Sequence, residues 1–235
     1  MKPKSRSLSG ATLMLIIIPV IVGLLACMPV PIGNPERSRI DPNMTGVWVA
    51  LSDEEPADGV LFHVFEPYDK RTWLVTWMAA EVGKNTDLSE YDLSTYEGFA
   101  KMAASEPVRD ENVYADGIAV YKAWVTKLGG ELFMTWEPKI LLDDGIADPE
   151  VWFVYRIIQD DADTIRMNYI DGDNSLFNGV KETRRAYEKV IRKNADNPEL
   201  YVGNGDDAVE MRLARVQGEE MDFFEELLSQ VVAFD

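Results

Sequence analysis

The chain of 235 residues has only one cysteine, Cys27, and one histidine, His63. A lone cysteine excludes an intramolecular disulfide, so a folded domain has to rely on its apolar core. A lone histidine excludes zinc sites built from several histidines and leaves a Ser-His triad few candidates. Nucleophile-elbow, zinc-protease, phosphate-loop and dinucleotide-binding patterns are also missing from the sequence. No motif therefore indicates catalysis, a cofactor or a metal, and His63 is expected to be a strand residue with a satisfied hydrogen bond.

Positive charge is scarce. Lysine and arginine number 23 against 41 aspartates and glutamates, which gives a net charge of −18. Lys2, Lys4 and Arg6 are the only charges before Cys27, so the rest of the chain is three units more negative than the whole. Such a surface repels nucleic acid and anionic lipid head groups, and nucleic-acid binding is not expected. The acidity suits cationic partners or divalent cations, or, more simply, solubility in salt.

The N-terminus has the features of a secretion signal. A basic start is followed by residues 11–25, which carry no charge, and a small residue, Ala26, precedes Cys27. A membrane-spanning helix needs about 20 apolar residues, and Pro19 interrupts this shorter run. The sequence therefore predicts a cleaved signal peptide over residues 1–26.

The run Leu24-Leu25-Ala26-Cys27 resembles the lipobox of bacterial lipoproteins, in which the cysteine becomes the first mature residue and carries acyl chains. The resemblance implies a lipid anchor on Cys27 at the bacterial cell envelope. Met28 stands where aspartate retains enterobacterial lipoproteins in the inner membrane, so the analogy implies the outer membrane. The alternative is an ordinary secretory signal with an incidental cysteine. Residues 27–42 are rich in proline and predict a semi-extended tether.

Eight runs rich in aromatic and β-branched residues predict strands. Short connections containing glycine or aspartate join three adjacent pairs, and such links form antiparallel hairpins. Helices are expected within a polar insertion at 87–113 and near the C-terminus. The predicted strands are 46–51, 59–66, 71–79, 115–127, 131–137, 151–159, 163–170 and 208–216, and the predicted helices are 95–104, 180–194 and 219–232.

The eight-stranded meander is expected to close on itself, because closure removes its exposed edges. Gly46-Val47-Trp48 resembles the opening of lipocalin-like barrels, where the tryptophan plugs one end and an arginine of the last strand packs across it. The resemblance implies Arg215 in this role, with Arg212 as the alternative. The usual lipocalin disulfide is impossible here, and the insertion is long. The hairpin at 127–133 is similar to one in uncharacterised small bacterial lipoproteins.

The predicted fold is thus mainly β: a single antiparallel, eight-stranded, up-and-down, lipocalin-like barrel at 43–217 with a helical insertion and C-terminal helices. The final helix belongs to residues 218–235. Trp73 and Trp77 share one face of their strand because side chains alternate along a strand. With Tyr121 they are the candidate ligand-binding residues of an interior suited to an apolar ligand. Alternatively, these rings simply fill the barrel.

One segment resembles a calcium loop. Asp171, Asp173 and Ser175 occupy the first, third and fifth positions, and Glu182 occupies the twelfth. Leu176 replaces the glycine at the sixth position, and a strand precedes the loop. The competing interpretation, in which Asp and Asn side chains cap the next helix, is favoured, and no metal site is predicted.

Three functions from different classes remain. The leading expectation is a membrane-anchored, non-catalytic envelope lipoprotein that binds a small apolar ligand or an envelope protein partner. The second is a structural or interaction lipoprotein with a filled core, which uses the insertion at 87–113 as its contact surface. The third is a hydrolase based on carboxylates, for which no particular pair stands out.

Overall fold

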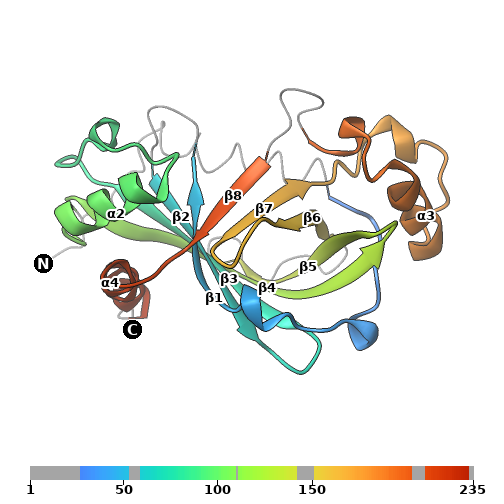
Figure 1. Ribbon diagram of the computed structural model, residues 1–235, viewed down its shortest axis with the longest axis horizontal. Helices are drawn as coiled ribbons and strands as arrows, with labels where there is room; N and C mark the ends of the chain where they lie inside the picture. The colour runs from blue at the N-terminus through green and yellow to red at the C-terminus, as the bar shows by residue number, and fades with distance from the viewer. Residues whose placement is uncertain (1–26, 53–58, 110, 142–150, 203–209, 233–235) are drawn as a thin grey trace, which may run out of the picture.

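The eight apolar runs form eight strands that close into one barrel, as the sequence predicts. The computed structural model describes residues 27–52, 59–109, 111–141, 151–202 and 210–232. Each strand pairs antiparallel with its neighbours in sequence, and β1 pairs with β8 (Figure 1). The strands are β1 Gly46–Leu51, β2 Gly59–Pro67, β3 Trp73–Val82, β4 Val113–Leu128, β5 Glu131–Leu141, β6 Phe153–Gln159, β7 Thr164–Tyr169 and β8 Glu210–Arg215.

Among the described residues, three α-helices lie outside the barrel. The helix α2 (Tyr96–Ser105) belongs to the insertion between β3 and β4, and α4 (Glu220–Val232) follows β8; both lie at one end of the molecule. The helix α3 (Arg184–Asn194) lies at the opposite end (Figure 1). All three confirm predicted helices, although α3 begins four residues later because Thr183 is its N-cap. Short 3-10 helices are Pro35–Arg37, Pro42–Met44, Leu88–Glu90, Ser175–Phe177 and Pro198–Leu200.

The barrel interior is one apolar core to which every strand contributes. Residues paired directly across two antiparallel strands lie on the same face, so the register identifies the inward positions. Trp48 pairs with His63, His63 with Trp77, and Trp73 with Ala123. The buried members of this core are Met44, Trp48, Phe65, Trp73, Val75, Ala123, Met134, Trp136, Ile157, Ile165, Met167 and Leu213.

Two further cores lie on the outer surface of the barrel. On β2, Phe62 packs against Phe99 of α2 and Phe224 of α4, with ring centroids 5.8 and 5.3 Å apart. At the other end, Phe133 and Val154 pack beneath α3. The buried residues of all three cores lie between Met28 and Leu227, so a chain that begins at Cys27 contains each of them.

Residues 28–42 do not form the expected semi-extended tether. Met28 and Ile32 are fully buried in the core beneath α3. Met28 also forms a β-bridge with Trp152, and both its N–H and its carbonyl take part in hydrogen bonds. The Ile32 carbonyl accepts hydrogen bonds from Trp124 Nε1 (2.7 Å) and Thr135 Oγ1 (2.9 Å). Proline content did not predict this packing, which depends on two apolar side chains.

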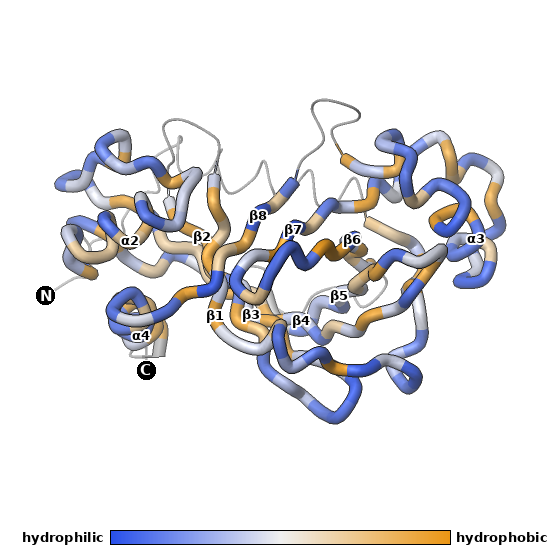
Figure 2. The backbone as a smooth tube through the Cα atoms, viewed as in Figure 1, coloured by the Kyte–Doolittle hydropathy of each residue, from blue (hydrophilic) through white to orange (hydrophobic). Residues whose placement is uncertain are grey.

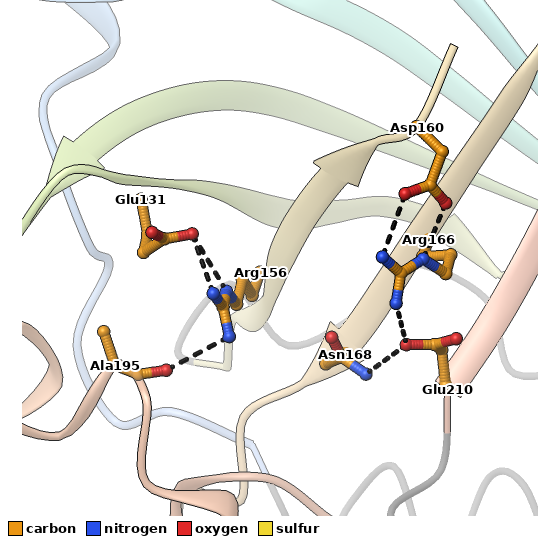
Figure 3. Close-up of polar contacts among 7 residues, drawn as sticks. All are labelled: Glu131, Arg156, Asp160, Arg166, Asn168, Ala195 and Glu210. Carbon is orange, nitrogen blue, oxygen red and sulfur yellow. Dashed lines mark hydrogen bonds and ion pairs between the residues drawn. The ribbon is translucent and has the colours of Figure 1, made fainter.

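Two arginines, Arg156 and Arg166, connect neighbouring strands of the barrel, and Arg156 also binds the end of α3. Arg156 of β6 binds Glu131 at 2.8 Å and donates to the carbonyl of Ala195, directly after α3 (Figure 3). On the neighbouring strands, Arg166 donates to Asp160 and Glu210. The bond from Arg166 holds the pKa of Asp160 below its ordinary value. The hydrogen bond from Arg156 to Ala195 therefore connects the end of α3 to β6, and Arg166 connects β7 to β8.

The first and last strands are joined by the side chains of Trp48 and Arg215. Trp48 is fully buried, and the Arg215 guanidinium lies 4.2 Å from the centroid of its ring. The guanidinium donates to the carbonyls of Thr45 (2.8 Å) and Ala162 (3.1 and 3.2 Å). Its Nε lies 3.2 Å from Asp163 Oδ1. The arginine therefore covers the Trp48 ring and binds two chain segments at this end of the barrel, the one that enters β1 and the one that connects β6 to β7.

Glycines with positive φ explain two local features of the barrel. Gly46 has φ +134°, and a Cβ there would lie 2.8 Å from Arg215 Nη1. A side chain at Gly46 would be strained and would collide with the guanidinium. Gly129 and Gly130 have φ of +65° and +107°, as the two-residue turn between β4 and β5 requires.

We expect Arg215→Lys to lower the free energy of unfolding by about 2 kcal/mol, because lysine keeps the charge but loses the planar, multiply bonded guanidinium. Arg212 is the matched control, because it lies on the same strand and pairs with Leu51. Arg212→Lys should change stability by less than about 0.5 kcal/mol. Chemical denaturation measures both values, and equal losses in the two variants would contradict this role for Arg215.

Candidate functional site

A continuous group of aromatic rings occupies the barrel interior. Ring centroids lie 5.2 Å apart between Tyr121 and Trp136, 4.7 Å between Trp136 and Tyr155, and 5.1 Å between Tyr155 and Tyr169. Phe153 contacts both Tyr121 and Tyr169 at the edge of this group. The rings come from four successive strands, β4 to β7. Contacts of this kind favour an interior that recognises apolar or aromatic surface.

The register places all three predicted ligand-binding residues on the inward face. Tyr121 joins the ring group directly. Trp73 is fully buried, and Ala123 lies between it and Trp136 in the sheet. Trp77 is partly exposed and pairs with His63. The three residues therefore line one interior.

The interior also contains buried nitrogen atoms without a protein partner. Both ring nitrogens of His63 and the indole nitrogens of Trp73 and Trp136 have no hydrogen-bond partner among the described residues. His63 and Trp136 are neighbours, with ring centroids 5.7 Å apart. The expected satisfied hydrogen bond of His63 is therefore wrong. An unpaired buried polar group costs about 1–3 kcal/mol, so three such side chains in one core require an explanation.

Burial controls the protonation of His63. The side chain is fully buried, and loss of water lowers its pKa to about 3. The imidazole is therefore neutral at ordinary pH, with one N–H donor and one acceptor nitrogen. The indoles of Trp73 and Trp136 each offer only a donor. A chemical group that pairs with these nitrogens would have to accept hydrogen bonds from the two indole N–H groups. It would also have to lie in apolar surroundings.

Cys27 lies beside the tyrosines of the interior. The Tyr169 hydroxyl donates a hydrogen bond to the Cys27 sulfur, and the sulfur also raises the pKa values of Tyr121 and Tyr155. Desolvation is the larger cause for both tyrosines and raises the pKa of Tyr121 to about 12. Burial likewise raises the pKa of the Cys27 thiol. A thiol of this kind is a poor nucleophile, which disfavours catalysis or redox chemistry at Cys27.

The predicted signal peptide, residues 1–26, lies outside the described residues. No helix in the described ranges has both the length and the apolar composition that crossing a membrane requires. The residue after Cys27, Met28, forms a β-bridge with Trp152, directly before β6.

The segment that resembles a calcium loop is a turn stabilised by its own side chains. Asp171 accepts a hydrogen bond from the N–H of Asp173, and Asn174 caps the 3-10 helix Ser175–Phe177 by accepting from Leu176. Over the part of the chain that is described, no group of three or more histidine, cysteine, aspartate or glutamate side chains is arranged to hold a metal ion. The capping interpretation accounts for these contacts.

The carboxylates do not form a reactive pair in the core. The buried polar or charged residues within the described ranges are Ser38, His63, Thr72, Thr135 and Asn168, none of which carries a carboxylate. A general acid of raised pKa requires a desolvated carboxyl or a close like charge. The hydrolase hypothesis therefore gains no support from the described residues.

Sequence reasoning missed four interior aromatics: Trp136, Phe153, Tyr155 and Tyr169. Their inward orientation follows from the register between β4 and β7. The signal in the sequence was the alternation of Phe153 and Tyr155 about Val154, which places both rings on one face. That face could be identified as the interior only after the neighbouring strands were aligned.

Comparisons with known proteins add no assignment. No family model matches the chain, and no curated protein or solved structure shows significant similarity to it. The features of this chain that bear on its function are the barrel interior, Cys27 and the surface.

His63 makes stability dependent on pH. Its pKa is lowered from 6.5 to about 3 on folding, so the unfolded chain binds more protons between these values, and stability falls as pH falls through this window. Between about pH 7 and pH 5 the loss should reach about 2 kcal/mol. His63→Phe should remove this component, as denaturation of both proteins at each pH would measure. Parallel stability profiles would contradict a neutral, buried His63.

Proposed function

We propose that this protein is a bacterial envelope lipoprotein, held at a membrane by acyl chains on Cys27. The signal-like N-terminus and the lipobox-like run before the only cysteine support the anchor. More than one acyl chain anchors a protein stably without a spanning helix. By analogy with lipoprotein sorting, Met28 favours the outer membrane.

The barrel of this lipoprotein binds a small, largely apolar ligand that carries a hydrogen-bond acceptor. The observation that carries this proposal is the set of unpartnered nitrogens of His63, Trp73 and Trp136 within an otherwise apolar interior. A purely hydrocarbon ligand would leave the indole N–H groups unpaired. A carbonyl, ester, ether or hydroxyl oxygen would accept from them, and the remainder of the ligand would contact the rings of Tyr121 and Tyr155.

A second candidate is an interaction lipoprotein with a filled core. The close ring contacts between Trp136 and its neighbours favour it, because they pack the middle of the barrel. The insertion at 87–113 would then be the contact surface, with Glu90, Asp92 and Glu97 exposed. Deleting it is not a usable test, since Phe99 and Met102 of α2 belong to the outer core. Substitution of the three exposed acids with crosslinking in the envelope would separate this candidate from the ligand-binding form.

The anchor is tested by Cys27→Ser. We expect the native protein to fractionate with membranes and to have a mass above that of the polypeptide from residue 27 by its acyl groups. The variant should show no acyl mass. Met28→Leu is the control, because it preserves an apolar buried residue and should remain acylated. Mass spectrometry of a native protein with an unmodified Cys27 sulfur would contradict the anchor.

The ligand is tested by organic extraction of the purified native protein followed by mass spectrometry. We expect an oxygen-containing, mainly apolar compound at near-stoichiometric amount. His63→Phe combined with Trp136→Phe should reduce its occupancy at least about tenfold, since two hydrogen-bonding groups are lost. Tyr68→Phe, at an exposed position, is the control and should retain the compound. Native protein free of any extractable compound would favour the filled-core candidate.

A further inference from the structure

One surface of this acidic protein is basic. Arg184, Arg185, Lys189 and Arg192 are exposed on α3 and, with Glu188, line a surface hollow of about 660 Å³. The helix is drawn largely in the hydrophilic colours (Figure 2). With four cations and one carboxylate, the charge of this surface is positive, although the whole chain has a net charge of −18. We call this surface the basic face of α3.

The single carboxylate of the basic face is already occupied. Glu188 accepts a hydrogen bond from the N–H of Gly33 at 3.1 Å, and its Oε1 lies 3.8 Å from Arg184 Nε. Within the described part of the chain, Arg185, Lys189 and Arg192 have no carboxylate at ion-pair distance. Their positive charge is therefore available to an external anion.

A second hollow, of about 440 Å³, continues the basic face. It shares Arg184, Glu188 and Arg192 with the first and adds the cations Arg37 and Lys127. Its remaining wall comes from Gly33 and Asn34 and from β4. The positive surface therefore extends from α3 onto the segment that leads away from Cys27.

The basic face lies close to the proposed anchor. Arg184 Nη1 donates to the Gly33 carbonyl at 3.1 Å, so α3 holds the N-terminal segment directly. Met28, the neighbour of Cys27, is buried in the same core as Tyr187 and Ile191 of α3. The residue next to the anchor position and the buried side of α3 therefore belong to the same apolar core. A bilayer that holds acyl chains on Cys27 therefore lies within reach of these cations.

We propose that the basic face of α3 binds the anionic head groups of the membrane that holds the anchor, and so fixes the orientation of the barrel on that membrane. This inference rests on the proposed anchoring at Cys27. The net charge of the whole chain predicts repulsion from anionic lipid, and the basic face is a local exception to it. Cations near an anionic bilayer attract it over about a Debye length, roughly 8–10 Å at physiological salt.

The test uses the chain from Cys27 onward with Cys27→Ser, so that no acyl chain contributes. Binding is measured by co-sedimentation with vesicles of phosphatidylcholine alone and of phosphatidylcholine with phosphatidylglycerol. We expect binding only to the anionic vesicles, weakening as salt is added. The variant Arg185→Gln, Lys189→Gln, Arg192→Gln should bind about a hundredfold more weakly, or about fivefold per cation.

The matched control is Lys70→Gln, Arg71→Gln, Arg109→Gln, which removes the same charge from exposed positions outside α3. The control should bind anionic vesicles as the parent does. Equal binding to both vesicle types, no binding to either, or an equal loss in the control would overturn the proposal. Because the assay contains no lipid anchor, a failure of acylation in the native protein would leave its result unchanged, and the two proposals can fail separately.

Discussion

The pairing of the first strand with the last is the constraint on which the remaining architecture depends. An open sheet of eight strands would expose two edges and would leave its aromatic face in water. Closure converts that face into an interior, and the stack of Arg215 on Trp48 covers one end of it. Because Arg215 also binds the segments that enter β1 and connect β6 to β7, the closure organises that end of the barrel.

Most of the fold could be predicted because each strand carries its own signal. Alternation, turn residues and short connections identified eight strands, and the Gly-x-Trp run indicated how they close. What could not be predicted was which side of a strand faces which core. Val47, Val49 and Phe62 face outward yet are buried, because α2 and α4 cover that side. A strand that is apolar on both faces has no polar–apolar alternation to show which face points inward. Trp136 and Tyr155 could therefore not be identified as interior residues from the sequence.

The candidate site shows a different limit of sequence reasoning. Alternation places Trp73 and Trp77 on one face of their strand, but only the strand register shows that this face and Tyr121 point into the barrel. The missing partners of His63 could not be predicted either, since a hydrogen bond depends on what lies across the barrel rather than along the strand. Similarly, the net charge describes the average surface and does not reveal the basic face of α3. The cations of that face lie on one side of a helix of eleven residues. The ligand proposal therefore arises from a feature that only the three-dimensional arrangement brings together.

The β-bridge between Met28 and Trp152 has a consequence for the order of events during biogenesis. Once β6 is in place, Met28 is fully buried and its backbone is bonded on both sides, while Tyr169 holds the sulfur of Cys27. The proposed acylation of Cys27 would therefore have to precede completion of the barrel, while the chain around residue 27 is still accessible.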